Sequence, residues 1–198
     1  MIINILTFSF SKIIVLCIVF FSQDILDSFI KHYEKNDNYI LKFEYVSVNN
    51  SEIIFKNKGK IMYSKKKFRI TLDEIVFIYD GKNYFNIVKE NLEVNIMKNN
   101  ELSNYLIPNN LSKTIKKNRN KIKIKKTENF QISYTDDNDN KYLLDIDNNY
   151  NILKIKQSLT ESYSNIIYFD KILFNQNLDE SLFVFSKSDY DGYYINEL

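Results

Sequence analysis

Apolar and polar residues alternate with a period of two along much of the chain, which predicts antiparallel strands with one face in water. The alternation is clearest over residues 59–96. Within this stretch, Asp80-Gly81 readily supplies the positive φ angles of a tight type I′ turn, and residues 82–87 are predicted to form the returning strand. The stretch is therefore predicted to be a β-meander.

A helical period precedes the first strand. Residues 24–36 place Ile25, Phe29 and Tyr33 on one side and charged residues on the other, which predicts an amphipathic helix. The period changes to two over residues 39–48, as in a strand. We expect the helix to cover this first strand.

Residues 101–115 are less regular and surround the only proline, Pro108. They predict one or two short helices, and a surface loop anchored by a few apolar residues is the alternative. The strand period then returns in segments separated mostly by Asn- and Asp-rich turns, at residues 130–134, 141–147, 151–159, 166–174 and 182–185. The tyrosine-rich residues beyond them are expected to pack against the protein.

Two polar motifs in this half of the chain allow a functional interpretation. Lys121–Lys125 alternates lysine with isoleucine, which fits either an acidic docking surface or a solvated strand face that discourages edge-to-edge association. Asp136–Asn140 carries three aspartates, but it lacks the glycine and the distant glutamate of an EF-hand calcium loop. We interpret it as a turn.

The N-terminus carries a short apolar run, residues 13–21, directly after Lys12. This pattern is typical of an export signal, so residues 1–22 are interpreted as a signal peptide and residues 23–198 as the mature chain. The expected cleavage follows Ser22, but Phe20 stands at the −3 position, where a small residue is usual. An uncleaved membrane anchor and a misassigned start codon are therefore the alternatives.

The amino-acid composition indicates the size of the core and the classes of partner that can be expected. The 198 residues, 44% of them hydrophobic, are expected to form one domain with a sizeable core. The chain has 15 Phe and 15 Tyr but no Trp, which is more aromatic surface than a small β-domain needs, so the rings are expected to line an interior. A net charge of +2 gives no reason to expect a nucleic-acid partner.

Residues suited to catalysis are scarce. His32 is the only histidine, and the only cysteine, Cys17, lies in the predicted signal, so the mature chain offers no Cys/His pair, zinc set or Ser/His/Asp triad. Asp73 and Glu74 are adjacent on a predicted strand and point to opposite faces, so they cannot flank one glycosidic bond. The sequence therefore predicts a protein that is not an enzyme, without metal ligands and without a cofactor.

The order of a signal peptide, an amphipathic helix, an aromatic first strand and a meander resembles the outer-membrane lipoprotein carrier family, LolA. The resemblance covers nearly the whole chain. Its most specific elements are Gly59, Lys67-Phe68-Arg69, Ile78–Lys82 with Tyr84, Asn91–Ile96, Phe183–Phe185 and Tyr193–Asn196.

The resemblance implies a mainly β fold with some α-helix, namely an incomplete antiparallel β-barrel whose apolar cavity is covered by short helices. The side chains then expected to line a lipid-binding cavity are Phe29, Tyr33, Tyr39, Leu41, Phe43, Tyr45, Phe55, Ile61, Tyr63, Phe77, Tyr79 and Phe85. The side chains expected to form the lid are Ile25, Leu26, Phe29, Ile30, Leu102, Tyr105 and Leu106.

The resemblance also implies carriage of acylated lipoproteins across the periplasm, from an inner-membrane release complex to an outer-membrane acceptor. We expect the same cargo, partners and location here, and a monomer. At residues 64–66 the family commonly has an arginine followed by a proline, and that arginine ties the lid to the barrel. This chain has neither residue there, so Lys65 and Arg69 are the candidates for a weaker latch.

Two other functions stay open. One is an envelope lipid-transfer or lipid-sensing protein of the same fold, which would handle free lipid. The other, of a different class, is a structural envelope protein whose barrel is filled by its own side chains.

Overall fold

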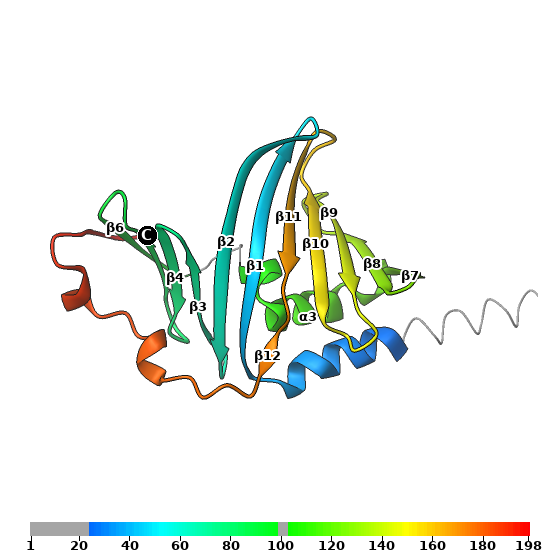
Figure 1. Ribbon diagram of the computed structural model, residues 1–198, viewed down its shortest axis with the longest axis horizontal. Coiled ribbons are helices and arrows are strands. Elements are labelled where there is room, and N and C mark those ends of the chain that lie inside the picture. The colour runs from blue at the N-terminus through cyan, green and yellow to red at the C-terminus, as the bar shows by residue number, and fades with distance from the viewer. Residues whose placement is uncertain (1–23, 99–102) are drawn as a thin grey trace, which may run out of the picture.

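One curved sheet forms the frame of the protein (Figure 1). The computed structural model describes residues 24–98 and 103–198. The predicted signal peptide, residues 1–22, and Leu102 lie outside the described residues. The strands are β1 Asn38–Asn49, β2 Glu52–Ser64, β3 Lys67–Leu72, β4 Ile75–Tyr79, β5 Tyr84–Val88, β6 Glu93–Met97, β7 Lys123–Lys126, β8 Phe130–Thr135, β9 Lys141–Ile146, β10 Ile152–Ser158, β11 Tyr163–Phe169, β12 Leu173–Phe174 and β13 Tyr194–Glu197.

The strands lie in the order β13-β6-β5-β4-β3-β2-β1-β11-β10-β9-β8-β7, and β12 pairs with the start of β1. Neighbouring strands are antiparallel, except that β13 runs parallel to β6. Within the described residues β7 and β13 are the two ends of this order, so the barrel is open. The predicted meander is strands β2 to β6. The predicted fold class, an open antiparallel barrel covered by short helices, is confirmed.

Helices cover one face of the sheet (Figure 1). The described residues of the N-terminal helix are 24–35, and α2 (Ser103–Leu106) and α3 (Pro108–Lys117) follow the meander. The predicted amphipathic helix is thus confirmed, and of the one or two short helices predicted for residues 101–115 the structure has two. Pro108 occupies the first position of α3, where a proline has no helical hydrogen bond to lose. Three 3₁₀ turns complete the helical segments, η1 Arg119–Lys121, η2 Glu180–Phe183 and η3 Lys187–Tyr190.

The hairpin between β4 and β5 differs from the prediction. Tyr79 pairs with Tyr84, so the loop has four residues, 80–83, and the returning strand starts two residues later than expected. The side chain of Asp80 is the reason: its Oδ1 accepts hydrogen bonds from the backbone N–H groups of Lys82 (2.7 Å) and Asn83 (2.8 Å). An Asx turn of this kind replaces the two-residue turn.

The predicted strand at residues 182–185 is also wrong. Asp179 accepts a hydrogen bond from the N–H of Ser181 at 2.8 Å, which starts the 3₁₀ turn η2 in place of a strand. The predicted packing of the tail is confirmed for Tyr190 and Tyr193 but not for Tyr194, which is 69% exposed. Tyr190 and Tyr193 contact the sheet, and β13 continues the sheet edge.

The Lys121–Lys125 motif ends in the edge strand β7. Ile122 and Ile124 pack against the hydrophobic core, and Lys123 and Lys125 are exposed. The predicted alternation is confirmed, and its docking interpretation stays a prediction.

The sheet carries one hydrophobic cluster on each face. The interior cluster consists of buried apolar side chains that helix 24–35, α2 and α3 share with strands β1–β3 and β8–β11. The outer cluster consists of Val76, Ile78, Phe85, Ile87 and Val94, on which the half-buried side chains of Ile96, Phe185, Tyr190, Tyr193 and Ile195 pack. Both faces of β4 and β5 are therefore covered.

Candidate functional site: the interior beneath the helices

The N-terminal helix turns one complete apolar stripe toward the sheet. Its members follow the spacing of a helix face and expose at most 5% of their surface: Ile25, Leu26, Phe29, Ile30 and Tyr33. The hydroxyl of Tyr33 accepts a hydrogen bond from the backbone N–H of Ile152 in β10, at 3.2 Å. The helix thus reaches the far half of the barrel.

The sheet supplies an aromatic floor. Tyr39 and Tyr63 stack with their ring centroids 4.9 Å apart, and both are buried. Burial raises the pKa of Tyr33 and Tyr39 well above the ordinary value, and it raises the pKa of Tyr63 to about 12. These three hydroxyls are therefore neutral at physiological pH.

Helix α3 closes the interior from the side and is tied to the N-terminal helix. The Nδ2 of Asn109 donates to the backbone oxygens of Tyr33, at 2.6 Å, and Asn36, at 3.3 Å. Two ion pairs add to this tie on the surface, Lys116 with Glu34 at 2.8 Å and Arg119 with Asp27 at 2.5 Å. The helices are joined to each other by polar groups and to the sheet mainly by apolar packing.

The structure brings together most of the side chains expected to line the cavity. In the interior cluster, buried or packed against it, are Phe29, Tyr33, Tyr39, Leu41, Phe43, Tyr45, Ile61, Tyr63, Phe77 and Tyr79. Phe55 is instead 49% exposed, and Phe85 belongs to the outer cluster on the opposite face. Phe85 pairs with Ile78 and shares its face, whereas its neighbour Tyr84 packs against the interior.

The expected lid residues pack against the same interior. Ile25, Leu26, Phe29, Ile30 and Leu106 are buried, and Tyr105 is half-buried against the cluster. These side chains fill the space between the helices and the sheet.

The latch candidates contact a different segment from the one expected. Lys65 forms an ion pair with Glu180 at 3.6 Å, and Nη1 of Arg69 donates to the backbone oxygen of Leu182 at 3.3 Å. Arg69 points to the outer face because its neighbour Phe68 faces the interior. The contacts that the structure shows for both residues therefore tie the C-terminal segment to the sheet, in place of a tie between lid and barrel.

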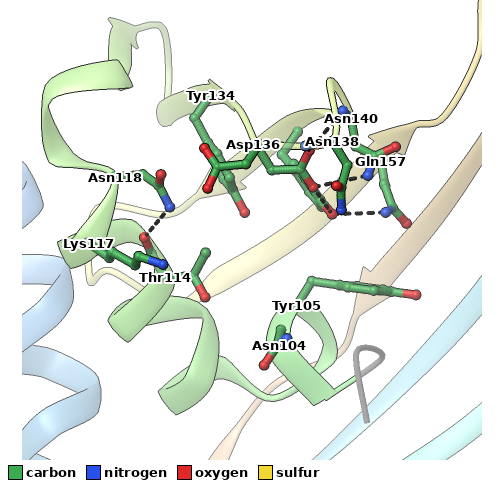
Figure 2. Close-up of a pocket in the computed structure, with 12 residues that line it drawn as sticks. Asn104, Tyr105, Thr114, Lys117, Asn118, Tyr134, Asp136, Asn138, Asn140 and Gln157 are labelled. Carbon is green, nitrogen blue, oxygen red and sulfur yellow. Dashed lines mark hydrogen bonds between the residues drawn. The ribbon is translucent and has the colours of Figure 1, made fainter. Parts of the chain in front are cut away.

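A polar pocket of about 290 Å³ opens where the interior meets solvent between α2, α3 and the β8–β9 hairpin (Figure 2). Tyr134 and Tyr142 stack at 4.7 Å and belong both to this pocket and to the interior cluster. Gln157 donates to the Tyr142 hydroxyl at 2.9 Å, and that hydroxyl donates to Asp136 at 3.2 Å. The pocket is thus a polar mouth of the aromatic interior.

Sequence reasoning missed this mouth. Its signal was present, because Tyr134 and Tyr142 lie on predicted strands at positions that face inward, next to a turn rich in polar residues. Asp136 itself accepts hydrogen bonds from the backbone N–H groups of Asn138 and Asn140, both at 2.9 Å. The interpretation of residues 136–140 as a turn is confirmed.

Other chemistry finds little support in the described parts of the chain. Over residues 24–98 and 103–198 no group of three or more His, Cys, Asp or Glu side chains is placed to hold a metal ion. His32 lies between the rings of Tyr33 and Phe174, with centroids 4.9 and 5.1 Å away. Burial lowers its pKa below the usual value of 6.5, so it is a neutral packing residue at pH 7.

None of the helices that the structure describes combines the length and the apolar character needed to cross a bilayer.

Comparisons with known proteins give a likeness in fold only. No protein-family model matches the chain, and no curated protein matches it. A solved structure of an uncharacterized conserved protein from Thermus thermophilus is similar with a TM-score of 0.56 and 8% identity, over 89% of this chain and 99% of that one. At this identity the likeness shows a shared fold and nothing about function.

Two other solved structures have lower scores. A LolA superfamily protein from Nitrosomonas europaea has a TM-score of 0.44 and 9% identity, over 82% of this chain and 96% of its own. A DUF1329 family protein from Desulfovibrio piger has a TM-score of 0.47 and 7% identity over the same shares.

Proposed function

We propose that the protein is a periplasmic carrier that binds the acyl chains of lipoproteins in the interior beneath the helices and transports them from the inner to the outer membrane. One observation carries the proposal: an aromatic interior is closed by helices that attach to the sheet mainly through apolar side chains. Such a cover can be replaced by acyl chains without breaking the sheet.

The N-terminal helix and an acyl chain gain free energies of the same order when they are buried against the interior. Covering one large apolar side chain gives roughly 1.5–3 kcal/mol, so the five stripe residues of the N-terminal helix contribute roughly 8–15 kcal/mol. An acyl chain with about 14 methylenes gives roughly 11 kcal/mol when it is buried. The helix and the acyl chain compete for one apolar surface with similar gains in free energy. The acyl chain can therefore be loaded and released without a covalent step.

The polar mouth fits the other half of such a cargo. Acyl chains in the interior would leave the polar backbone of a lipoprotein near Gln157, Tyr142 and Asp136, which offer hydrogen-bonding groups at the opening. In this proposal the protein is a monomer that exchanges cargo with a release complex in the inner membrane and an acceptor in the outer membrane. It performs no enzymatic step.

The experiment is native mass spectrometry of the protein purified from its own envelope, followed by loading with a synthetic acylated lipopeptide. The matched control is the same peptide without acyl chains. We expect one acylated peptide per protein and no binding of the unacylated form. Retention of free phospholipid alone would favour lipid transfer or sensing.

A filled structural barrel is the second candidate, and the tight packing of Phe29 and Tyr33 against the sheet favours it. It predicts that the protein stays empty and that an environment-sensitive fatty-acid probe does not bind. That result would contradict the carrier proposal.

A further inference from the structure

Two turns meet at one end of the sheet and form a tip. The long hairpin of β1 and β2 turns at residues 49–51, beside the turn between β10 and β11 (Figure 1, top). The backbone N–H of Asn50 donates to the backbone oxygen of Ser162 at 3.0 Å. The tip is therefore one joined structure and not two separate loops.

The tip carries apolar side chains that are in large part exposed. Ile53, Ile54 and Phe55 are 61%, 56% and 49% exposed, and Leu159 of the neighbouring turn is 39% exposed. Phe55 pairs with Ser47 and Ile53 pairs with Val48, which are consecutive residues of β1 and point to opposite faces, and Ile54 is the extra residue of a β-bulge between the two pairs. Strand β2 is therefore apolar on both faces here. Elsewhere the outer face of the same strand carries lysines, as the alternation of a wetted strand requires. A contiguous exposed patch of this kind marks an interaction surface.

The outer face of the sheet beside the tip is basic. Its side chains include Lys56, Lys58 and Lys60 on β2, Lys42 on β1, and Lys154 and Lys156 on β10. Lys42 lies directly opposite Lys60, and like charges in that position are destabilising without an anion nearby.

Acidic groups offset this charge only in part. Among the six lysines Glu44 binds Lys56 at 3.1 Å, and Asp145 lies opposite Lys154. Glu52 and Glu161 are exposed at the turns themselves. The charge of the outer face thus favours a partner that is anionic over an extended area.

We propose that the tip is a membrane-docking element, which inserts Ile53, Ile54 and Phe55 into the interface of an anionic bilayer while the outer-face lysines contact the lipid headgroups. Exposed apolar side chains with flanking lysines are the combination that interfacial binding uses. The residues of this surface are different from those that line the interior and its mouth. The inference therefore does not depend on the carrier proposal and goes beyond it.

The chain offers a direct reporter. It contains no tryptophan, so Phe55→Trp places the only indole at the tip. With vesicles of phosphatidylcholine and phosphatidylglycerol we expect a blue shift of its emission and protection from an aqueous quencher. With phosphatidylcholine alone we expect a smaller shift. An emission spectrum that vesicles leave unchanged overturns the proposal.

Co-sedimentation with the same vesicles tests whether the apolar residues of the tip are needed for binding. The variant with Ile53→Ser, Ile54→Ser and Phe55→Ser together is expected to lose binding at least tenfold. The matched control replaces three apolar residues that are equally exposed elsewhere, Leu92, Val184 and Tyr194, by serine and is expected to bind as the wild type does. Equal binding by both variants overturns the proposal.

The outer-face lysines can be tested in the same co-sedimentation experiment. Lys58→Glu is expected to weaken binding to anionic vesicles by tenfold or more, because each lysine near such a surface contributes roughly fivefold and the exchange reverses a charge. Binding should also weaken as salt rises. If the tip is needed to bind an envelope protein but not vesicles, the docking surface is for protein and the proposal fails.

Discussion

The interior cluster and the outer cluster lie on opposite faces of the same sheet, yet their covers are attached in different ways. The interior is covered by helices and the outer cluster by the chain from Glu180 to Glu197. Both covers bury aromatic rings: Phe29 lies 5.2 Å from Tyr33 in the first, and Phe85 stacks on Phe185 at 4.5 Å in the second. Packing alone therefore does not distinguish them.

The difference lies in the hydrogen bonds to the sheet. Strand β13 extends the ladder of β6, with Tyr194 N–H donating to Leu92 at 2.8 Å and Leu198 N–H donating to Ile96 at 2.9 Å. The helices instead bond chiefly to each other, and their exposed ion pairs are worth at most about 1 kcal/mol each.

This contrast teaches which cover can move. Displacing the C-terminal segment costs backbone hydrogen bonds together with apolar contacts. Displacing the helices costs mainly apolar contacts, and those a lipid can restore. The helical side is thus the one suited to exchange a ligand, which is the basis of the carrier proposal.

The largest effect is expected from truncating the ring at the centre of each cluster. Phe29→Ala and Phe85→Ala should each lower the free energy of unfolding by about 3–5 kcal/mol, because both rings are buried. Urea unfolding measures this loss. Only Phe29→Ala should increase the binding of a fluorescent fatty acid, since it weakens the helical cover. Equal effects of the two variants on probe binding would break the comparison.

Asn109 tests the polar tie between the helices. Asn109→Ala leaves the buried backbone oxygen of Tyr33 without its donor and should cost about 1–3 kcal/mol in urea unfolding. Probe binding should rise as it does for Phe29→Ala. A stability loss with unchanged probe binding would show that the helices do not open as one unit.

Tyr194→Pro tests the backbone tie of the outer cover. It removes the N–H that bonds to Leu92 and should cost about 1 kcal/mol, with faster amide exchange along β6. Tyr194→Ala keeps the N–H and removes a side chain that is 69% exposed, so it is the control. Fatty-acid binding should stay at the wild-type level in both. An increase would mean that the two covers are coupled.

His32 gives the helical cover a dependence on pH. Burial depresses its folded-state pKa, so its contribution to stability is present above about pH 6.5 and is lost as pH falls through the folded value. Unfolding at pH 5 and pH 7.5 should therefore differ less for His32→Phe than for the wild type. The hydrogen bond that the His32 ring donates to Asn151 and the Coulombic influence of Asp147 both oppose the lowering of its pKa, so Asp147→Asn should enlarge the difference.

The smallest effect is expected at Lys65. Its ion pair with Glu180 is exposed and screened by solvent, so Lys65→Leu should leave the urea midpoint of unfolding nearly unchanged. Because that pair lies on the outer cover, loading and release of the probe should be unchanged. A change in either rate would restore Lys65 as a latch between lid and barrel.

Much of this arrangement follows from the period of the sequence. Alternation placed Tyr39, Leu41, Ile61 and Tyr63 on one face correctly, because the buried face of a half-wet strand must be apolar at every second residue. The sequence indicates only that Pro108 would interrupt a single helix, and in the structure it does so by starting α3, at a position where it loses no helical hydrogen bond.

The outer cluster was harder to predict from the sequence. Residues 75–79 form an unbroken apolar run, which indicates burial on both faces, but nothing local identifies the distant segment that covers the second face. For this reason the sequence analysis assigned Phe85 to the cavity, whereas its side chain lies in the outer cluster. The loop at 80–83 and the turn at 180–183 depend on single aspartate side chains that compete with strand pairing.

The parallel pairing of β13 with β6 also affects the order of folding. The two strands are separated by about a hundred residues, so this contact closes a long loop, which favours its late formation. Until residues 194–197 have been synthesised, the edge of β6 presents free backbone groups that can pair with another chain. Aggregation of nascent or truncated chains is therefore expected to start at β6, and a chaperone that protects the unfinished protein would have to cover that edge.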